Sequence, residues 1–169
     1  MKQPILRALL ATACGLCTLG AAFADSGRAM PRTVPTAYPQ ECASCHVAYP
    51  PGMLPARSWQ RLMSGLDRHY GTDASIDAAT VTQLSTWLQA HAADGQRAAQ
   101  EPPQDRITRA AWFERKHREI EPAVWQLPSV KSAANCAACH VGAEQGRFDD
   151  DDLRMPAGLT PRQRRAWND

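Results

Sequence analysis

The sequence predicts an all-α protein made of two small lobes with extensive loops. Apolar residues recur at helical spacing in three stretches, at about 55–70, 77–94 and 108–120. No pair of alternating segments joined by a tight turn indicates a β-hairpin. Thirteen prolines and ten glycines in 169 residues predict long irregular connections around the helices.

The first 24 residues have the pattern of a secretory signal peptide. Lys2 and Arg7 precede an apolar stretch of small residues from 8 to 22, and residues 22–24 (Ala-Phe-Ala) match a signal peptidase site. We therefore expect cleavage before Asp25 and export of the rest; the alternatives are a retained membrane anchor and a lipoprotein. Cleavage removes two of the six cysteines and leaves a mature chain with no net formal charge.

Composition and charge exclude several functional classes. The formal charge of +2 is small, and no basic patch with interleaved aromatic residues points to nucleic acid. Beyond the N-terminal stretch, no apolar run is long enough to span a bilayer, so we expect no stable membrane insertion after cleavage. No Ser/His/Asp constellation or carboxylate dyad suggests a hydrolase.

The four remaining cysteines form two copies of one motif. Each copy is CxxCH, the attachment signature of c-type haem: Cys42-Ala-Ser-Cys45-His46 and Cys136-Ala-Ala-Cys139-His140. Thiols at this spacing lie about one helical turn apart, which suits thioether bonds to the two vinyl groups of one porphyrin. The adjoining histidine then supplies the proximal axial ligand. The motifs therefore predict two covalently bound haem c groups.

Other uses of four cysteines fit this pattern less well. A Cys₄ zinc site would draw on pairs about 90 residues apart and would leave both following histidines unexplained. A thioredoxin-like redox pair belongs in a βαβ context, and no strand pattern surrounds either motif. Two disulfides are the usual expectation for an exported chain, but they give the repeated histidine no role.

The sixth position of each iron decides whether the protein transfers electrons or binds gases and does chemistry. His69 continues an apolar stripe on a helix that we expect from Pro55 to Tyr70, ended by Gly71. His117 shares a face with Phe113 on a helix that we expect Thr108 to cap. Both imidazoles are therefore predicted to point inward, where an iron would satisfy them.

His91 and Met155 remain alternative ligands. His91 shares a face with Leu84 and Leu88 on a helix expected to run from a cap at Asp77 to Asp94, with Gly95 just after its end. Periodicity therefore does not exclude it. Met155-Pro156 resembles the Met-Pro that supplies the distal ligand in many monohaem cytochromes c.

The two motifs divide the chain. Residues 95–105 contain glycine, polar residues and a Pro-Pro pair, which suits a connection between lobes. We expect a signal peptide at 1–24, an N-terminal haem lobe at 25–100 and a C-terminal haem lobe at 101–169.

The segments around both motifs resemble the bacterial dihaem cytochrome c family, from about Tyr38 to Pro156. The segments that carry the resemblance are 41–52 (ECASCHVAYPPG), 54–59 (LPARSW), 66–73 (LDRHYGTD), 115–119 (RKHRE), 135–140 (NCAACH) and 142–147 (GAEQGR). The resemblance implies an N-terminal lobe similar to class I cytochromes c and a less regular C-terminal lobe. It also implies bis-His ligation, with His46 and His69 on one iron and His140 and His117 on the other, rather than ligation by Met155.

Taken together, motif and resemblance predict a periplasmic dihaem electron carrier that is not an enzyme. The resemblance implies a small oxygen-binding monohaem cytochrome as electron acceptor and a membrane cytochrome b as donor. The alternatives are a gas-binding or peroxidase-like protein with one open iron, and the dihaem electron-entry subunit of a larger oxidoreductase such as periplasmic nitrate reductase.

Overall fold

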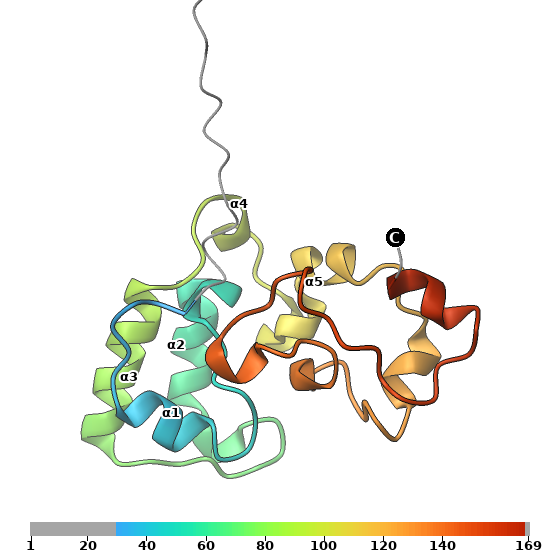
Figure 1. The fold of residues 1–169 in the computed structure, drawn as a ribbon. Helices are drawn as coiled ribbons and strands as arrows, with labels where there is room; N and C mark the ends of the chain where they lie inside the picture. Colours follow the sequence, from blue (N-terminus) through green and yellow to red (C-terminus); the bar gives the residue numbers. More distant parts are fainter. Residues whose placement is uncertain (1–29, 168–169) are drawn as a thin grey trace, which may run out of the picture.

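The computed structural model describes residues 30–167 as short helices joined by irregular segments (Figure 1). No strand forms within this range; two isolated bridges, His69 with Thr72 and His140 with Leu153, are its only β-type pairings. The all-α prediction is confirmed. No helix in the described range is long and apolar enough to cross a membrane. The predicted signal peptide lies outside the described residues.

The N-terminal lobe is built on two helices that pack against each other. Its helices are α1 (Ala37–Cys42), the 3-10 turn η2 (Pro51–Met53), α2 (Ala56–Ser64), the 3-10 turn η3 (Leu66–Arg68) and α3 (Ala78–Ala90). Trp59 and Met63 of α2 are buried against Leu84 and Leu88 of α3, and Tyr38 of α1 completes this core. The burial follows the three- and four-residue spacing in each helix.

The helix expected over Pro55–Tyr70 is shorter than predicted. α2 ends at Ser64, and Gly65 follows at φ −127° and ψ 30°, outside helical geometry. A glycine inside a helix is costly because it has more backbone freedom to lose than other residues. The chain restarts as the single turn η3, so His69 lies in a tight turn after it and not on a continuous helix.

α3 begins where expected and ends early. The Asp77 carboxylate accepts a hydrogen bond from Thr80 N–H at 3.0 Å, which confirms the predicted cap. The predicted end at Asp94 is wrong, because α3 stops at Ala90 and Ala93 N–H bonds instead to the Leu54 carbonyl at 2.9 Å. Gly95 opens the short helix α4 (Gly95–Ala98) and does not end α3.

The described part of the C-terminal lobe has one α-helix, α5 (Ala111–Lys116). The other helical pieces of this half are 3-10 turns: η4 (Pro103–Asp105), η5 (Ile107–Arg109), η6 (Pro122–Gln126), η7 (Cys136–Ala138), η8 (Ala143–Gln145) and η9 (Gln163–Trp167). The predicted cap at Thr108 is wrong: this residue lies inside η5, and Ala110 precedes α5. The buried side chains Phe113, Val124 and Val130 form a small core.

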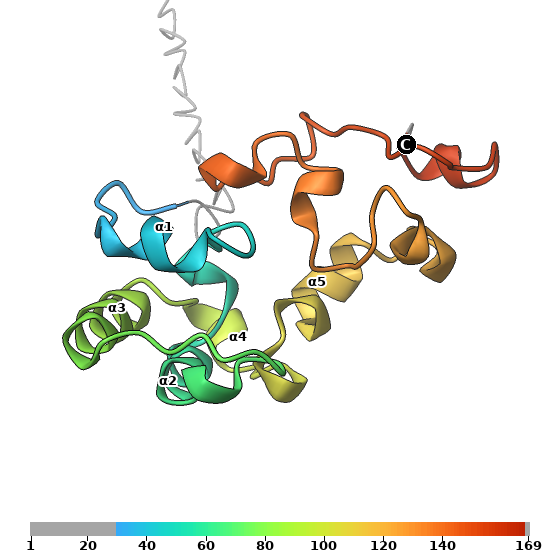
Figure 2. The same cartoon turned by 90° about the horizontal axis from the view of Figure 1, so that it is seen from below.

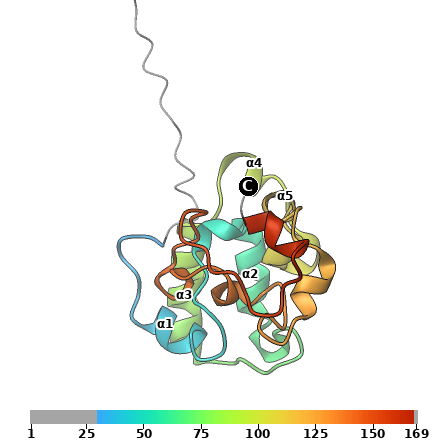
Figure 3. The ribbon, with the colours of Figure 1, turned by 45° about the vertical axis from the view of Figure 1, so that its right-hand side comes forward.

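The lobes lie side by side, with the N-terminal helices at the left of Figure 1 and the C-terminal half at the right. Figure 2 shows the same arrangement from below, and Figure 3 looks more nearly along the line that joins the lobes. Tyr49 Oη donates to the Ala134 carbonyl across the junction at 2.9 Å. Gly146, at φ +70°, packs on Met30: a Cβ there would lie 2.9 Å from that of Met30.

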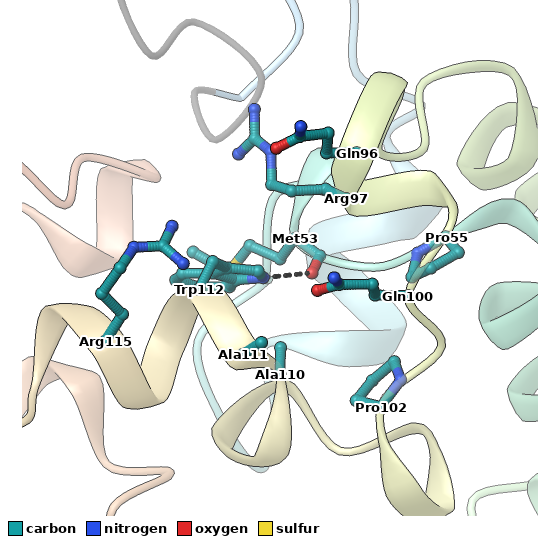
Figure 4. A pocket seen from close by; sticks show the side chains of 10 residues that line it. All are labelled: Met53, Pro55, Gln96, Arg97, Gln100, Pro102, Ala110, Ala111, Trp112 and Arg115. Atoms are coloured by element: carbon teal, nitrogen blue, oxygen red, sulfur yellow. Dashed lines mark hydrogen bonds between the residues drawn. The ribbon is translucent and has the colours of Figure 1, made fainter.

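A small pocket also lies between the lobes (Figure 4). Trp112 Nε1 of α5 donates to the Met53 carbonyl at 3.2 Å along its wall. The pocket has a volume of about 110 Å³, which is smaller than the pockets that bind drug-sized ligands. No cysteine or histidine lines it, so it is not a haem site.

The packing of α2 on α3 makes Leu84 a test of the N-terminal core. Leu84→Ala removes a side chain that is completely buried and should lower the free energy of unfolding by about 2–5 kcal/mol. Denaturant titration of the holoprotein measures the change. Gln83→Ala, at the exposed neighbouring position, should change it by less than about 0.5 kcal/mol. Equal effects of the two substitutions would contradict this packing.

Candidate haem sites

Four of the five histidines form two facing pairs. The ring centroids of His46 and His69 lie 6.2 Å apart, with an interplanar angle of 30°. The centroids of His117 and His140 lie 6.2 Å apart as well, at 73°. Each pair joins the histidine of one CxxCH motif to a histidine outside it, and these are the pairs that the family resemblance implies.

The spacing within each pair fits one metal ion between two imidazoles. A metal–imidazole bond is about 2.0 Å long, so two opposed rings on one metal have centroids about 6 Å apart once the ring radii are included. Two imidazoles hydrogen-bonded directly to each other would lie closer than this. The residues present therefore fit two haem irons.

The first site begins at the end of α1. Cys42 is its last residue, and the chain then turns through Cys45 and His46, which are exposed. His46 Nδ1 lies 2.8 Å from the Val47 carbonyl. A carbonyl only accepts, so Nδ1 carries the proton and Nε2 keeps the lone pair that a metal requires. The ring of Tyr49 stacks on His46, with centroids 4.9 Å apart.

His69 completes this site from the turn after η3. Its Nδ1 is buried and has no hydrogen-bond partner among residues 30–167. Burial, and to a lesser degree the nearby His46, lower the pKa of His69. The neutral imidazole, which is the form that binds metals, is therefore favoured.

The second site begins at the end of α5. His117 is the residue at which this helix stops, and its Nδ1 lies 2.9 Å from the Phe113 carbonyl, one turn back. The proton is again fixed on Nδ1, which leaves Nε2 for a metal. Phe113 stacks on the imidazole with centroids 4.0 Å apart, and Trp125 lies 5.9 Å away.

The second motif folds as one helical turn. Both Cys139 N–H and His140 N–H bond to the Cys136 carbonyl, at 3.2 and 2.9 Å, as the motif spacing predicts. Arg154 N–H then bonds to the Cys139 carbonyl at 2.7 Å, and Leu153 forms an isolated bridge with His140. The ring of Phe148 meets the edge of His140 with centroids 5.7 Å apart, and the neighbouring Leu153 and Val141 are exposed apolar residues.

No disulfide joins the four described cysteines, and the first thiol of each motif differs from a redox-active one. All four described cysteines are free thiols. Burial raises the pKa of Cys42 and that of Cys136 to about 11, whereas redox-active CxxC thiols have lowered values. Within the described range no three His, Cys, Asp or Glu residues gather into a cluster that could hold a bare metal ion, which argues against the zinc alternative.

The structure separates the two alternative ligands from these pairs. His91 is exposed at the end of α3, and its ring lies against Trp87 with centroids 5.4 Å apart. No second imidazole faces it in the described part of the chain. The side chain of Met155 is 43% exposed. The aromatic neighbours Tyr49 and Tyr70 were not predicted, although each lies within three residues of a pair histidine in the sequence.

Comparisons with known proteins identify the family. The family model described as dihaem cytochrome c matches residues 38–148. The chain belongs to the dihaem cytochrome c family. Such a protein carries two haem groups, for which the chain has two CxxCH motifs and two facing imidazole pairs. A comparison with curated proteins gave no match.

Two solved dihaem cytochromes are similar along most of the chain. The diheme cytochrome c of Rhodobacter sphaeroides is 44% identical, with a TM-score of 0.61, covering 71% of this chain and 100% of that one. The diheme cytochrome c of Shewanella baltica OS155 is 38% identical, with a TM-score of 0.63, covering 73% and 96%.

The pairing predicts which histidines control the spin states of the two irons. His69→Ala or His117→Ala should convert one haem to high spin, because each removes one imidazole of a facing pair. His91→Ala, the matched control, should leave both haems low-spin. The absorption spectra of the ferric variants measure this. A high-spin haem in the His91→Ala protein would show that the pairs are assigned wrongly.

Proposed function

We propose that this dihaem cytochrome is a carrier of single electrons in which both irons are bound by two imidazoles. The observation that carries the proposal is the equal spacing of the two histidine pairs, 6.2 Å in each case. An iron with two protein ligands has no position for a substrate, so transfer between proteins is the chemistry that remains. The carrier is then not an enzyme.

Each group would be held by one motif and one distal histidine. Cys42 and Cys45 would attach the first haem, with His46 and His69 as axial ligands. For the second haem the attachment residues would be Cys136 and Cys139, and the axial ligands His140 and His117. The histidine pair beside each motif and the neutral imidazole tautomers support these roles.

Bound haem supplies the one-electron couple of its iron, and the chain restricts how its ligands move. The Phe113 carbonyl and ring hold His117 from two directions, at 2.9 Å and 4.0 Å. Tyr49 covers one face of His46. Imidazoles held in this way change position little between oxidation states, which keeps the barrier to electron transfer low.

The cellular setting is part of the proposal. The signal-peptide pattern of residues 1–24 supports export to the periplasm, where c-type haem attachment takes place in bacteria. A second haem protein would be the electron acceptor, such as a small oxygen-binding monohaem cytochrome, and a membrane cytochrome b the donor. The family membership supports such partners.

Carbon monoxide distinguishes a closed carrier from a protein with an open iron. The dithionite-reduced holoprotein should keep its absorption spectrum when carbon monoxide is added, because the sixth position of each iron is filled. A haem protein with an open iron serves as the positive control. An immediate, high-affinity spectral shift would contradict the proposal and favour a gas-binding or peroxidase-like function. Co-purification with a large catalytic subunit from the native source would instead identify an electron-entry subunit.

A further inference from the structure

Tyr70 connects the distal histidine of the first site to the connection between the lobes. Its ring meets the edge of His69 with centroids 4.9 Å apart. Its hydroxyl lies 3.1 Å from the Gln104 carbonyl and 3.0 Å from the Asp105 carbonyl, to which it donates. The guanidinium of Arg106 lies 4.2 Å from the centre of the Tyr70 ring, a cation–π contact.

Arg61 of α2 fixes this part of the connection to the N-terminal lobe. Its Nε and Nη2 donate to the two oxygens of the Asp105 carboxylate at 2.9 and 2.6 Å, and Nη2 also donates to Glu101 at 2.8 Å. Two-point binding of this kind is geometrically specific as well as strong. The Asp105 side chain is only 14% exposed, and Arg61 lowers its pKa. We call residues 101–106, with Arg61, the linker clamp.

Backbone strain is concentrated at the same contact. Four non-glycine residues in the described range have positive φ, and three of them are Tyr70 (51°), Gln104 (58°) and Asp105 (55°). A non-glycine residue in this region costs of order 1–3 kcal/mol and persists where its surroundings hold it firmly. Tyr70 and the linker clamp therefore hold each other in conformations that neither would favour alone.

His69 has more need of such support than His46 and His117. His46 and His117 each donate Nδ1–H to a backbone carbonyl, which sets the orientation of the ring. The buried Nδ1 of His69 has no such acceptor in the part of the chain that the structure describes. Its orientation depends on the His69–Thr72 turn and on the ring of Tyr70.

We propose that the linker clamp is a positioning device which, through Tyr70, keeps the His69 imidazole facing His46. The proposal rests on the proposed ligation of the first iron by these two histidines. Weakening the clamp lets His69 turn away more often and so opens the first site, while the second site, with its own contacts, stays closed. The connection between the lobes thereby controls the access of small ligands to one haem.

Two substitutions weaken the clamp without touching a ligand. Tyr70→Phe removes the hydroxyl and the hydrogen bond that it shares between the Gln104 and Asp105 carbonyls, while keeping the ring against His69. Arg61→Gln removes the two-point bond to Asp105. Arg57→Gln is the matched control, because it makes the same change at an exposed position on the same helix. His69→Ala is the reference for a first site that is fully open.

The rate of carbon monoxide binding to the reduced holoproteins measures how often the first site opens. It is followed to long times at high gas concentration. Tyr70→Phe and Arg61→Gln should each increase the rate about tenfold, at one haem per chain, as expected for losing one or two hydrogen bonds. Arg57→Gln should match the unaltered protein. Hydrogen exchange of the peptide spanning residues 66–74 should rise in the two clamp variants, which reports the turn independently of the haem.

The outcomes separate the clamp from the ligation on which it rests. Fast binding to His69→Ala, with both clamp variants equal to Arg57→Gln in binding rate and in exchange, would overturn the clamp and leave the proposed ligation intact. Unchanged binding to His69→Ala would overturn the ligation, and the clamp proposal with it.

Discussion

The fold brings two imidazoles to a fixed spacing at each of two sites. The centroid spacing of 6.2 Å is the same in both pairs, although one pair meets at 30° and the other at 73°. The two sites also draw their distal histidines from different settings, a turn after η3 and the end of α5. The distal histidines therefore have different local structures but the same distance from their partners, as expected if one metal must fit between the rings.

Short helices and loops can hold such a spacing only if other contacts fix them. Outside the α2–α3 pair, the lobes have small cores, so single hydrogen bonds and aromatic contacts carry much of the positioning. Tyr49 is one such residue, because its ring stacks on His46 and its hydroxyl bonds to Ala134, two residues before the second motif. Phe113 holds His117 by two contacts, one through its ring and one through its carbonyl.

The sequence was most informative where chemistry restricts the residue type. CxxCH spacing predicted both motifs, and the second folds as the expected turn on the Cys136 carbonyl. Periodicity was less reliable: it made His91 equivalent to His69, because it describes a helix face and not what that face meets. The break at Gly65 and the early end of α3 depend on long-range contacts, such as Ala93 to Leu54, that no local pattern contains.

The central claim is that two histidines hold each iron, and low-temperature electron paramagnetic resonance of the oxidised holoprotein tests it most directly. We expect two low-spin ferric centres per chain with the spectral character of bis-imidazole ligation and no high-spin component. A high-spin signal integrating to one iron per chain, or a spectrum of the histidine–methionine type, would contradict it.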